Sequence, residues 1–251
     1  MSVKLAKDGP VTIVTIDRPD KRNAVDPATA NLLREAFATF VEDDDAKVAI
    51  LTGNAGQFCA GFDLGAVGTS HYDPDGPGPM GPTRMLIEKP VIAAVEGHAV
   101  AGGLELALWC DLRIAAASAV FGVYCRRWGV PLIDGGTVRL PRIVGQGRAL
   151  DMILTGRPVT ADEAFRIGLA DRIVEDGGTL ATAIELAKQI AAFPQICMNS
   201  DRLGAYRQWD YDIEDALTYE AHAGVAPLRE GAAAGAKRFT EGAGRGGNFS
   251  D

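Results

Sequence analysis

The order of hydrophobic patterns along the chain is the feature that most constrains its fold. Short apolar and β-branched runs at 4–7, 11–16, 48–51, 90–95, 112–115, 120–121 and 172–174 alternate with helical patterns. From Pro194 onward only helical patterns follow. Alternating strands and helices are typical of α/β folds, whereas a run of helices indicates a separate helical region. The sequence therefore predicts an α/β core over residues 1–193 and a helical C-terminal region over 194–251.

Two connecting segments have clear local signatures. Asp26 followed by Pro27 predicts the N-cap and first residue of a helix, which extends to about Val41 because apolar residues recur at helical spacing. Residues 65–82 are rich in glycine and proline, which predicts a mobile surface loop without a helix or a central strand.

Composition excludes several classes of function. The 251 residues carry 25 Lys and Arg against 33 Asp and Glu, a net charge of −8 without a basic block, so no nucleic-acid or anionic membrane partner is expected. The most apolar stretch, 91–109, is interrupted by Glu96, His98 and Glu105, so no membrane span is expected. Four cysteines without C-x-x-C spacing and an N-terminus without an apolar signal core predict a cytoplasmic protein. The three histidines, at 71, 98 and 222, have no metal-ligand spacing, so no metal site is expected.

Two glycine-containing segments, 57–64 and 96–106, each follow a predicted buried strand. In the second, Gly102 and Gly103 open a helix, which directs backbone N–H groups and the positive end of the helix dipole toward a bound group. Close packing of a helix on a strand would explain one such glycine pair. Two segments together favour a site that holds an oxyanion.

These segments carry a resemblance to a known family. The chain resembles the enoyl-CoA hydratase/isomerase, or crotonase, superfamily over most of its length. The matching motifs, in the family's order and spacing, are Arg18-Pro19 with Lys21-Arg22-Asn23-Ala24, Phe58 to Leu64, Lys89 to Gly97, Ala101 to Ala107 with Cys110-Asp111, Gly135-Gly136-Thr137 with Leu140-Pro141-Arg142, and Leu154-Thr155-Gly156 with Ala161, Ala164 and Gly168-Leu169.

The resemblance implies a fold, a substrate class and an assembly. The fold is an α/β spiral of β-β-α units with a helical C-terminal trimerisation region, and the assembly is a homotrimer or a hexamer. The substrate is an acyl-CoA thioester, with coenzyme A as part of the substrate and no metal or redox cofactor.

The resemblance also assigns roles to residues. The backbone N–H groups of Phe62 and Gly102 would hold the thioester carbonyl, whose oxygen becomes negative as an enolate forms. Coenzyme A would bind at Lys21, Arg22, Ala24 and Ala60, although Lys21 and Arg22 also suit an ordinary solvated loop.

Glu105 is the first predicted catalytic acid. An acid among apolar neighbours is expected to have a raised pKa, and it matches one of the two catalytic glutamates of hydratases. The alternative is a solvent-facing position on a half-buried helix. The second glutamate would lie twenty positions later, where the chain has Cys125, a poor substitute for a carboxylic acid.

Asp134 is the candidate replacement for that second glutamate. It matches a catalytic aspartate of dienoyl-CoA isomerases and haloaroyl-CoA dehalogenases, and the alternative is an N-cap for the following helix. Tyr124, Cys125 and Trp128 would line the acyl pocket, and Arg126 and Arg127 would either pair with a substrate carboxylate or lie on the surface.

The sequence thus predicts an acyl-CoA lyase or isomerase, acting through an enolate by hydration or isomerisation of an enoyl-CoA. Three alternatives stay open: decarboxylation or hydrolysis of the thioester, binding of acyl-CoA without turnover, and a structural trimer without a ligand.

Overall fold

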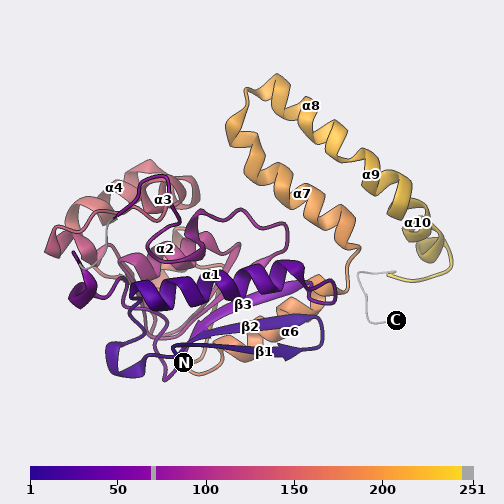
Figure 1. Cartoon of the computed structure of the whole chain (residues 1–251). Helices are drawn as coiled ribbons and strands as arrows, with labels where there is room; N and C mark the ends of the chain where they lie inside the picture. Colours follow the sequence, from indigo (N-terminus) through magenta and orange to yellow (C-terminus); the bar gives the residue numbers. More distant parts are fainter. Residues whose placement is uncertain (69–71, 245–251) are drawn as a thin grey trace. The chain divides into compact units, whose positions relative to one another are not determined.

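The computed structural model describes residues 1–68 and 72–244, and it divides into two compact units, Met1–Ile190 and Ala191–Asp251 (Figure 1). Among the described residues, the first unit contains all the strands, and the second contains only helices and the turns that connect them. The sequence predicted a boundary between the core and the helical region after residue 193. The division of the chain into these two domains stays a prediction.

A six-stranded sheet forms the centre of the first unit. Its order is β1 (Val3–Asp8), β2 (Val11–Ile16), β3 (Val48–Gly53), β4 (Val91–Val95), β6 (Leu112–Ala116) and β9 (Arg172–Val174). The first pair is antiparallel and all the other pairs are parallel. β3 and β4 are buried along almost their whole length, which explains why they read as continuous apolar runs without alternation.

After β4 the chain enters a second, smaller sheet. It consists of β5 (His98–Val100), β7 (Val120–Gly122) and β8 (Val159–Thr160), with β5 and β7 parallel. The chain changes sheets at Glu96 and Gly97, which separate β4 from β5 by two residues. β5 and β8 were not expected from the sequence, because strands this short show no hydrophobic period.

Six α-helices belong to the first unit as the structure describes it: α1 (Pro27–Glu42), α2 (Gly102–Trp109), α3 (Gly136–Val144), α4 (Gln146–Thr155), α5 (Ala161–Arg166) and α6 (Thr179–Ala191). α1 begins where predicted, since the Asp26 carboxylate accepts a hydrogen bond from Thr29 N at 2.8 Å. α1 then lies against β1 and β2 (Figure 1). Its buried residues include Leu33, Phe37 and Phe40.

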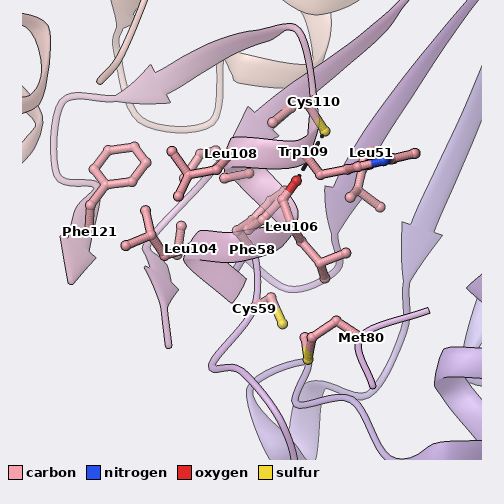
Figure 2. Packing of buried hydrophobic residues seen from close by; sticks show 14 of the residues in the cluster. Leu51, Phe58, Cys59, Met80, Leu104, Leu106, Leu108, Trp109, Cys110 and Phe121 are labelled. Carbon is pink, nitrogen blue, oxygen red and sulfur yellow. Dashed lines mark hydrogen bonds between the residues drawn. The ribbon is translucent and has the colours of Figure 1, made fainter. Parts of the chain in front are cut away.

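All eight residues of α2 are buried. Figure 2 shows Leu104, Leu106 and Leu108 extending from this helix among Leu51 and Phe121 of the neighbouring strands. A helix that is hydrophobic all round must be enclosed by the rest of the protein. Any polar side chain on α2 is therefore also withdrawn from bulk water.

The glycine- and proline-rich segment differs from its prediction. No α-helix or strand lies in its described residues, as expected, but the surface-loop prediction is wrong from Gly78 onward. Gly78 and the run from Met80 to Thr83 are buried, and backbone groups withdrawn from water there have partners: Met80 N donates to Asp134 Oδ1 and Gly81 N donates to Gly78 O. Residues 69–71, which belong to the same predicted loop, lie outside the described residues.

The second unit contains α7 (Gln195–Arg207), α8 (Ile213–Ala223), α9 (Val225–Pro227) and α10 (Ala233–Thr240), with a π-helical turn at Leu228–Ala232. α7 packs against α8, and Asp212 caps the N-terminus of α8 by accepting from Glu214 N and Asp215 N. Ile213, Leu217 and Leu228 are more than half exposed. None of the described helices is both long enough and apolar enough to cross a membrane.

Candidate active site

A cavity of about 840 Å³ brings most of the predicted site residues together. Of the residues predicted from sequence, those that line it are Arg22, Ala60, Phe62, Gly102, Glu105, Tyr124, Cys125, Trp128 and Asp134. Lys21 and Ala24 do not line it: Lys21 is exposed at the end of a short 3-10 turn, and Ala24 is buried.

The loop after β3 and the N-terminus of α2 meet at the floor of this cavity. Gly61 has a φ of +101°, and a β-carbon there would lie 3.0 Å from Gly102 N and 2.8 Å from the Ala101 side chain. Only glycine fits such a close approach. On the other side of the loop, Val25 N donates to Gly61 O, and Val25 O accepts from Asp63 N. The Phe62 N–H, which lies between these two contacts, takes part in neither. Within the described chain, neither Phe62 N–H nor Gly102 N–H donates a hydrogen bond to protein.

Ala101 holds this arrangement in a strained backbone conformation. Its φ of 54° and ψ of −126° lie in a region that residues with a β-carbon rarely adopt. Hydrogen bonds on both sides maintain it, because Ala101 N donates to Gly122 O of β7 and Ala101 O accepts from Leu104 N. Strained residues of this kind concentrate at functional sites. Here the strain determines how the Gly102 N–H is directed.

Glu105 lies in the first turn of α2 and is 3% exposed, so the solvent-facing alternative is wrong. Its Oε1 atom accepts hydrogen bonds from the N–H groups of Asp134 and Gly136, both at 2.9 Å. Burial, followed by the negative charge of Asp134, raises the pKa of Glu105 to about 7, and the two N–H groups oppose this shift. Glu105 can therefore both give and take a proton near neutral pH.

Asp134 is as deeply buried as Glu105 and faces the same cavity. Its Oδ1 atom accepts from Met80 N at 3.0 Å and from the Thr83 hydroxyl. Burial raises the pKa of Asp134, and the Thr83 hydroxyl is the strongest opposing influence. The N-cap alternative is wrong, because Gly135 precedes α3 and no side chain caps that helix.

Cys125 stands beside these two acids in the short turn Tyr124–Trp128. Burial and then the charge of Glu105 raise the pKa of its thiol, so the thiol is neutral at physiological pH. The neighbouring arginines do not line the cavity: Arg126 donates to Ile153 O at 3.1 Å, and Arg127 donates to Gly156 O at 2.9 Å. The surface alternative for these arginines agrees with this placement better than pairing with a substrate carboxylate.

Sequence reasoning missed several contributors to the site. Met80 lies in the segment predicted as a surface loop, and Thr83 follows that segment directly. Neither residue was singled out, nor were Asn31 and Arg34 of α1, which line the cavity as Met80 does. Nothing local marks these residues as part of a site, because only the fold brings them to it. Among the described residues no group of three His, Cys, Asp or Glu side chains could hold a metal ion. The Nδ1 atom of His98 lies 3.1 Å from Gln57 Oε1, within hydrogen-bond distance. His71 is outside the described residues.

Comparisons with known proteins indicate the family of this chain. A family model described as enoyl-CoA hydratase/isomerase matches residues 6–200. The chain belongs to this family. A carnitinyl-CoA dehydratase of Salmonella arizonae is 39% identical to it over 224 residues, which cover 87% of this chain and 85% of that protein. The enoyl-CoA hydratase EchA19 of Mycobacterium tuberculosis is 40% identical over 196 residues, 73% of this chain and 72% of that protein.

A solved structure extends the similarity to the fold of this family member. The crystal structure of an enoyl-CoA hydratase from Mycobacterium tuberculosis H37Rv superposes with a TM-score of 0.90 at 33% identity, and 96% of each chain is covered. The predicted family and crotonase fold are therefore confirmed. The predicted function, that of a lyase of the enoyl-CoA hydratase/isomerase family acting on acyl-CoA, is confirmed at the level of the family.

Proposed function

We propose that this enoyl-CoA hydratase/isomerase family member catalyses the reversible addition of water to an enoyl-CoA, with Glu105 and Asp134 as its acid–base pair. One observation carries the proposal: two buried carboxyl groups face one cavity beside two backbone N–H groups that have no partner among the described residues. The names of the relatives, a hydratase and a dehydratase, support water as the group added or removed.

The thioester carbonyl would accept hydrogen bonds from Phe62 N–H and Gly102 N–H. When water attacks the β-carbon, the electron pair of the double bond moves toward the carbonyl oxygen and forms an enolate. Donors directed at such an oxygen contribute about 3 to 4 kcal/mol each to stabilising the transition state. The dipole of α2, which begins at Gly102, adds to this effect.

The two acids would divide the proton transfers. Asp134 as a carboxylate takes a proton from the attacking water, and Glu105 in its protonated form gives a proton to the α-carbon. One water is thus added across the double bond, and the reverse sequence removes it. Two carboxyl groups whose surroundings set different pKa values suit this division of roles.

We also propose the following about substrate binding, cofactors and assembly. Coenzyme A binds near Lys21, Arg22, Ala24 and Ala60, of which Arg22 and Ala60 line the cavity, and no other cofactor takes part.

The exposed apolar residues of α8 and the π-helical turn support a homotrimer or a stacked hexamer, which sedimentation equilibrium would distinguish from a monomer. Four free cysteines support a reducing compartment such as the cytoplasm.

Double-bond isomerisation is a second candidate, because Glu105 has a pKa of about 7 and can both take and give a proton beside the two unpaired N–H groups. Isomerisation moves a proton from one carbon to another and needs no water. It would use the same oxyanion donors and the same Glu105.

Mass spectrometry in water labelled with heavy oxygen and deuterium tests both candidates. The substrates are enoyl-, dienoyl-, hydroxyacyl- and malonyl-type CoA thioesters, incubated with wild type, Glu105→Gln and the matched control Glu175→Gln, an exposed glutamate far along the chain. We expect wild type and control to add heavy oxygen to an enoyl-CoA, and Glu105→Gln to lose this activity.

Other outcomes would replace the proposal. Deuterium uptake without oxygen supports isomerisation, loss of carboxylate supports decarboxylation, and release of free coenzyme A supports hydrolysis. Binding of the thioesters without any change would indicate an acyl-CoA-binding protein.

A further inference from the structure

The buried turn between Gly78 and Thr83 contacts one of the proposed catalytic groups directly. Met80 N and the Thr83 hydroxyl both donate to the same atom of Asp134, Oδ1. No described residue donates to the other carboxylate oxygen, Oδ2. Thr83 and Asp134 are 51 positions apart in the sequence.

The surroundings leave Thr83 little freedom. Thr83 is 1% exposed, and its backbone carbonyl accepts a hydrogen bond from Arg139 Nη2 at 2.7 Å. Arg139 Nη1 donates to the carbonyl of Asp134 at 3.0 Å, so one guanidinium ties the turn to the aspartate's own backbone. There is also no room for a side chain at Gly78, where a β-carbon would lie 2.5 Å from Asp134 Oδ1 and 2.1 Å from the Thr83 hydroxyl.

We propose that Thr83 is a positioning residue of the active site, which holds Oδ1 of Asp134 and leaves Oδ2 as the oxygen that meets the substrate. This inference rests on the proposed function, in which Asp134 is an acid–base group. A carboxylate with one oxygen occupied by two donors has a defined orientation, and acid–base catalysis depends on such orientation at the reacting atom.

The same contact favours the ionised form of Asp134. A hydrogen bond donated to a carboxylate stabilises its charge and lowers its pKa. The charged groups that act on Asp134 are Arg84 and Arg139, which also favour ionisation, and Glu105, whose charge opposes it. Loss of the Thr83 hydroxyl therefore raises the pH at which Asp134 becomes an active base.

The test compares Thr83→Val, which removes the hydroxyl at nearly constant shape, with Thr83→Ser, which keeps it. Thr52→Val is the matched control, since Thr52 is also buried but donates to Ala94 O at 3.1 Å, outside the cavity lining. For each variant, kcat and KM for enoyl-CoA hydration are measured from acid to neutral pH. Thr83→Ala replaces Thr83→Val if the valine variant does not fold.

We expect Thr83→Val to lower kcat about tenfold or more, with KM within about twofold of wild type. The acid limb of its pH profile moves up by about one pH unit, because a hydrogen bond to a charged group is lost. Thr83→Ser and Thr52→Val keep the wild-type profile. In an Asp134→Asn background, Thr83→Val causes no further loss of kcat.

An unmoved pH profile together with a loss of kcat that persists in the Asp134→Asn background would overturn the inference, since Thr83 would then be merely structural. So would wild-type kcat in Thr83→Val while Asp134→Asn is inactive. If Asp134→Asn itself keeps full activity, the role of Asp134 in the proposed function fails first, and the inference fails with it.

Discussion

At the scale of single residues, the environment of each acid determines what it can do. Glu105 and Asp134 are buried to the same degree, yet Glu105 accepts only backbone N–H groups, whereas Asp134 also accepts a hydroxyl. Cys125, at the position of the missing glutamate, has a thiol whose pKa is raised further from neutrality. The second proton-transfer group is therefore better sought at Asp134 than at Cys125.

This assignment predicts opposite results for two substitutions. Cys125→Ala should keep kcat/KM within about threefold of wild type, because a neutral thiol moves no proton at neutral pH. Asp134→Asn should lower kcat/KM by about a hundredfold or more, the usual contribution of a positioned general acid or base. Steady-state kinetics on an enoyl-CoA measure both. The reverse pattern would make Cys125 the replacement for the second glutamate.

At the scale of elements, the beginning of α1 is stabilised by contacts that also reach the oxyanion loop. The Asp26 carboxylate caps α1 and pairs with Arg18 at 2.9 Å, and Arg18 also pairs with Asp63 at 3.1 Å. These contacts connect the loop before α1 with the segment that carries the Phe62 N–H. Their loss affects both a helix terminus and the geometry of the site.

Removing the cap should therefore destabilise the protein measurably. Asp26→Ala is expected to lower the free energy of unfolding by about 1 kcal/mol, the usual value for loss of an N-cap. Urea denaturation followed by circular dichroism measures it. Asp20→Ala, at an exposed aspartate near the same loop, serves as the control and should have no effect. Equal destabilisation by both substitutions would contradict the capping role.

A buried threonine in β2 predicts a change in the other direction. The Thr12 hydroxyl is buried without a hydrogen-bond partner, and Thr12 is 4% exposed. Thr12→Val removes this unpaired group and keeps the β-branched shape, so it should raise the free energy of unfolding by about 1 kcal/mol. Thr15→Val in the same strand, only half-buried, is the comparison for urea denaturation. A loss of stability in Thr12→Val would mean that the hydroxyl has a partner, such as a bound water.

At the scale of the whole molecule, the site places an acid where its charge is costly, and this links stability to pH. The pKa of Glu105 is about 7 in the folded protein, against 4.5 for an ordinary glutamate side chain. Between these two values the folded state holds a proton that the unfolded state has released. The free energy of unfolding therefore falls as pH rises through this interval.

Comparison with a variant isolates this contribution. Relative to Glu105→Gln, wild type should lose about 3 kcal/mol of unfolding free energy as pH rises from 4.5 to above 7, since each unit of pKa shift corresponds to about 1.4 kcal/mol. Urea denaturation at a series of pH values measures the difference, in which the contributions of groups that do not interact with Glu105 cancel. A difference that is constant with pH would show that Glu105 titrates normally in the folded protein.

Parts of this molecule could be predicted from local sequence. The Asp26–Pro27 signal and the spacing of Leu33, Phe37 and Phe40 determine α1, because capping and a buried helical face depend on neighbours within a few turns. The apolar runs of β3 and β4 are equally local. Motif order was sufficient to indicate the family, the N–H pair at Phe62 and Gly102, and the acid at Glu105.

The tertiary structure alone decided the rest. β5 and β8 are strands only because β7 lies between them, and the buried turn from Gly78 to Thr83 donates two hydrogen bonds to Asp134, a residue far away in the sequence. The sequence by itself determined α1 and the long buried strands β3 and β4, since these follow from contacts between near neighbours. Which carboxyl group lies near Glu105, and which hydroxyl donates to that group, depends on contacts between residues far apart in the chain, and only folding brings those together.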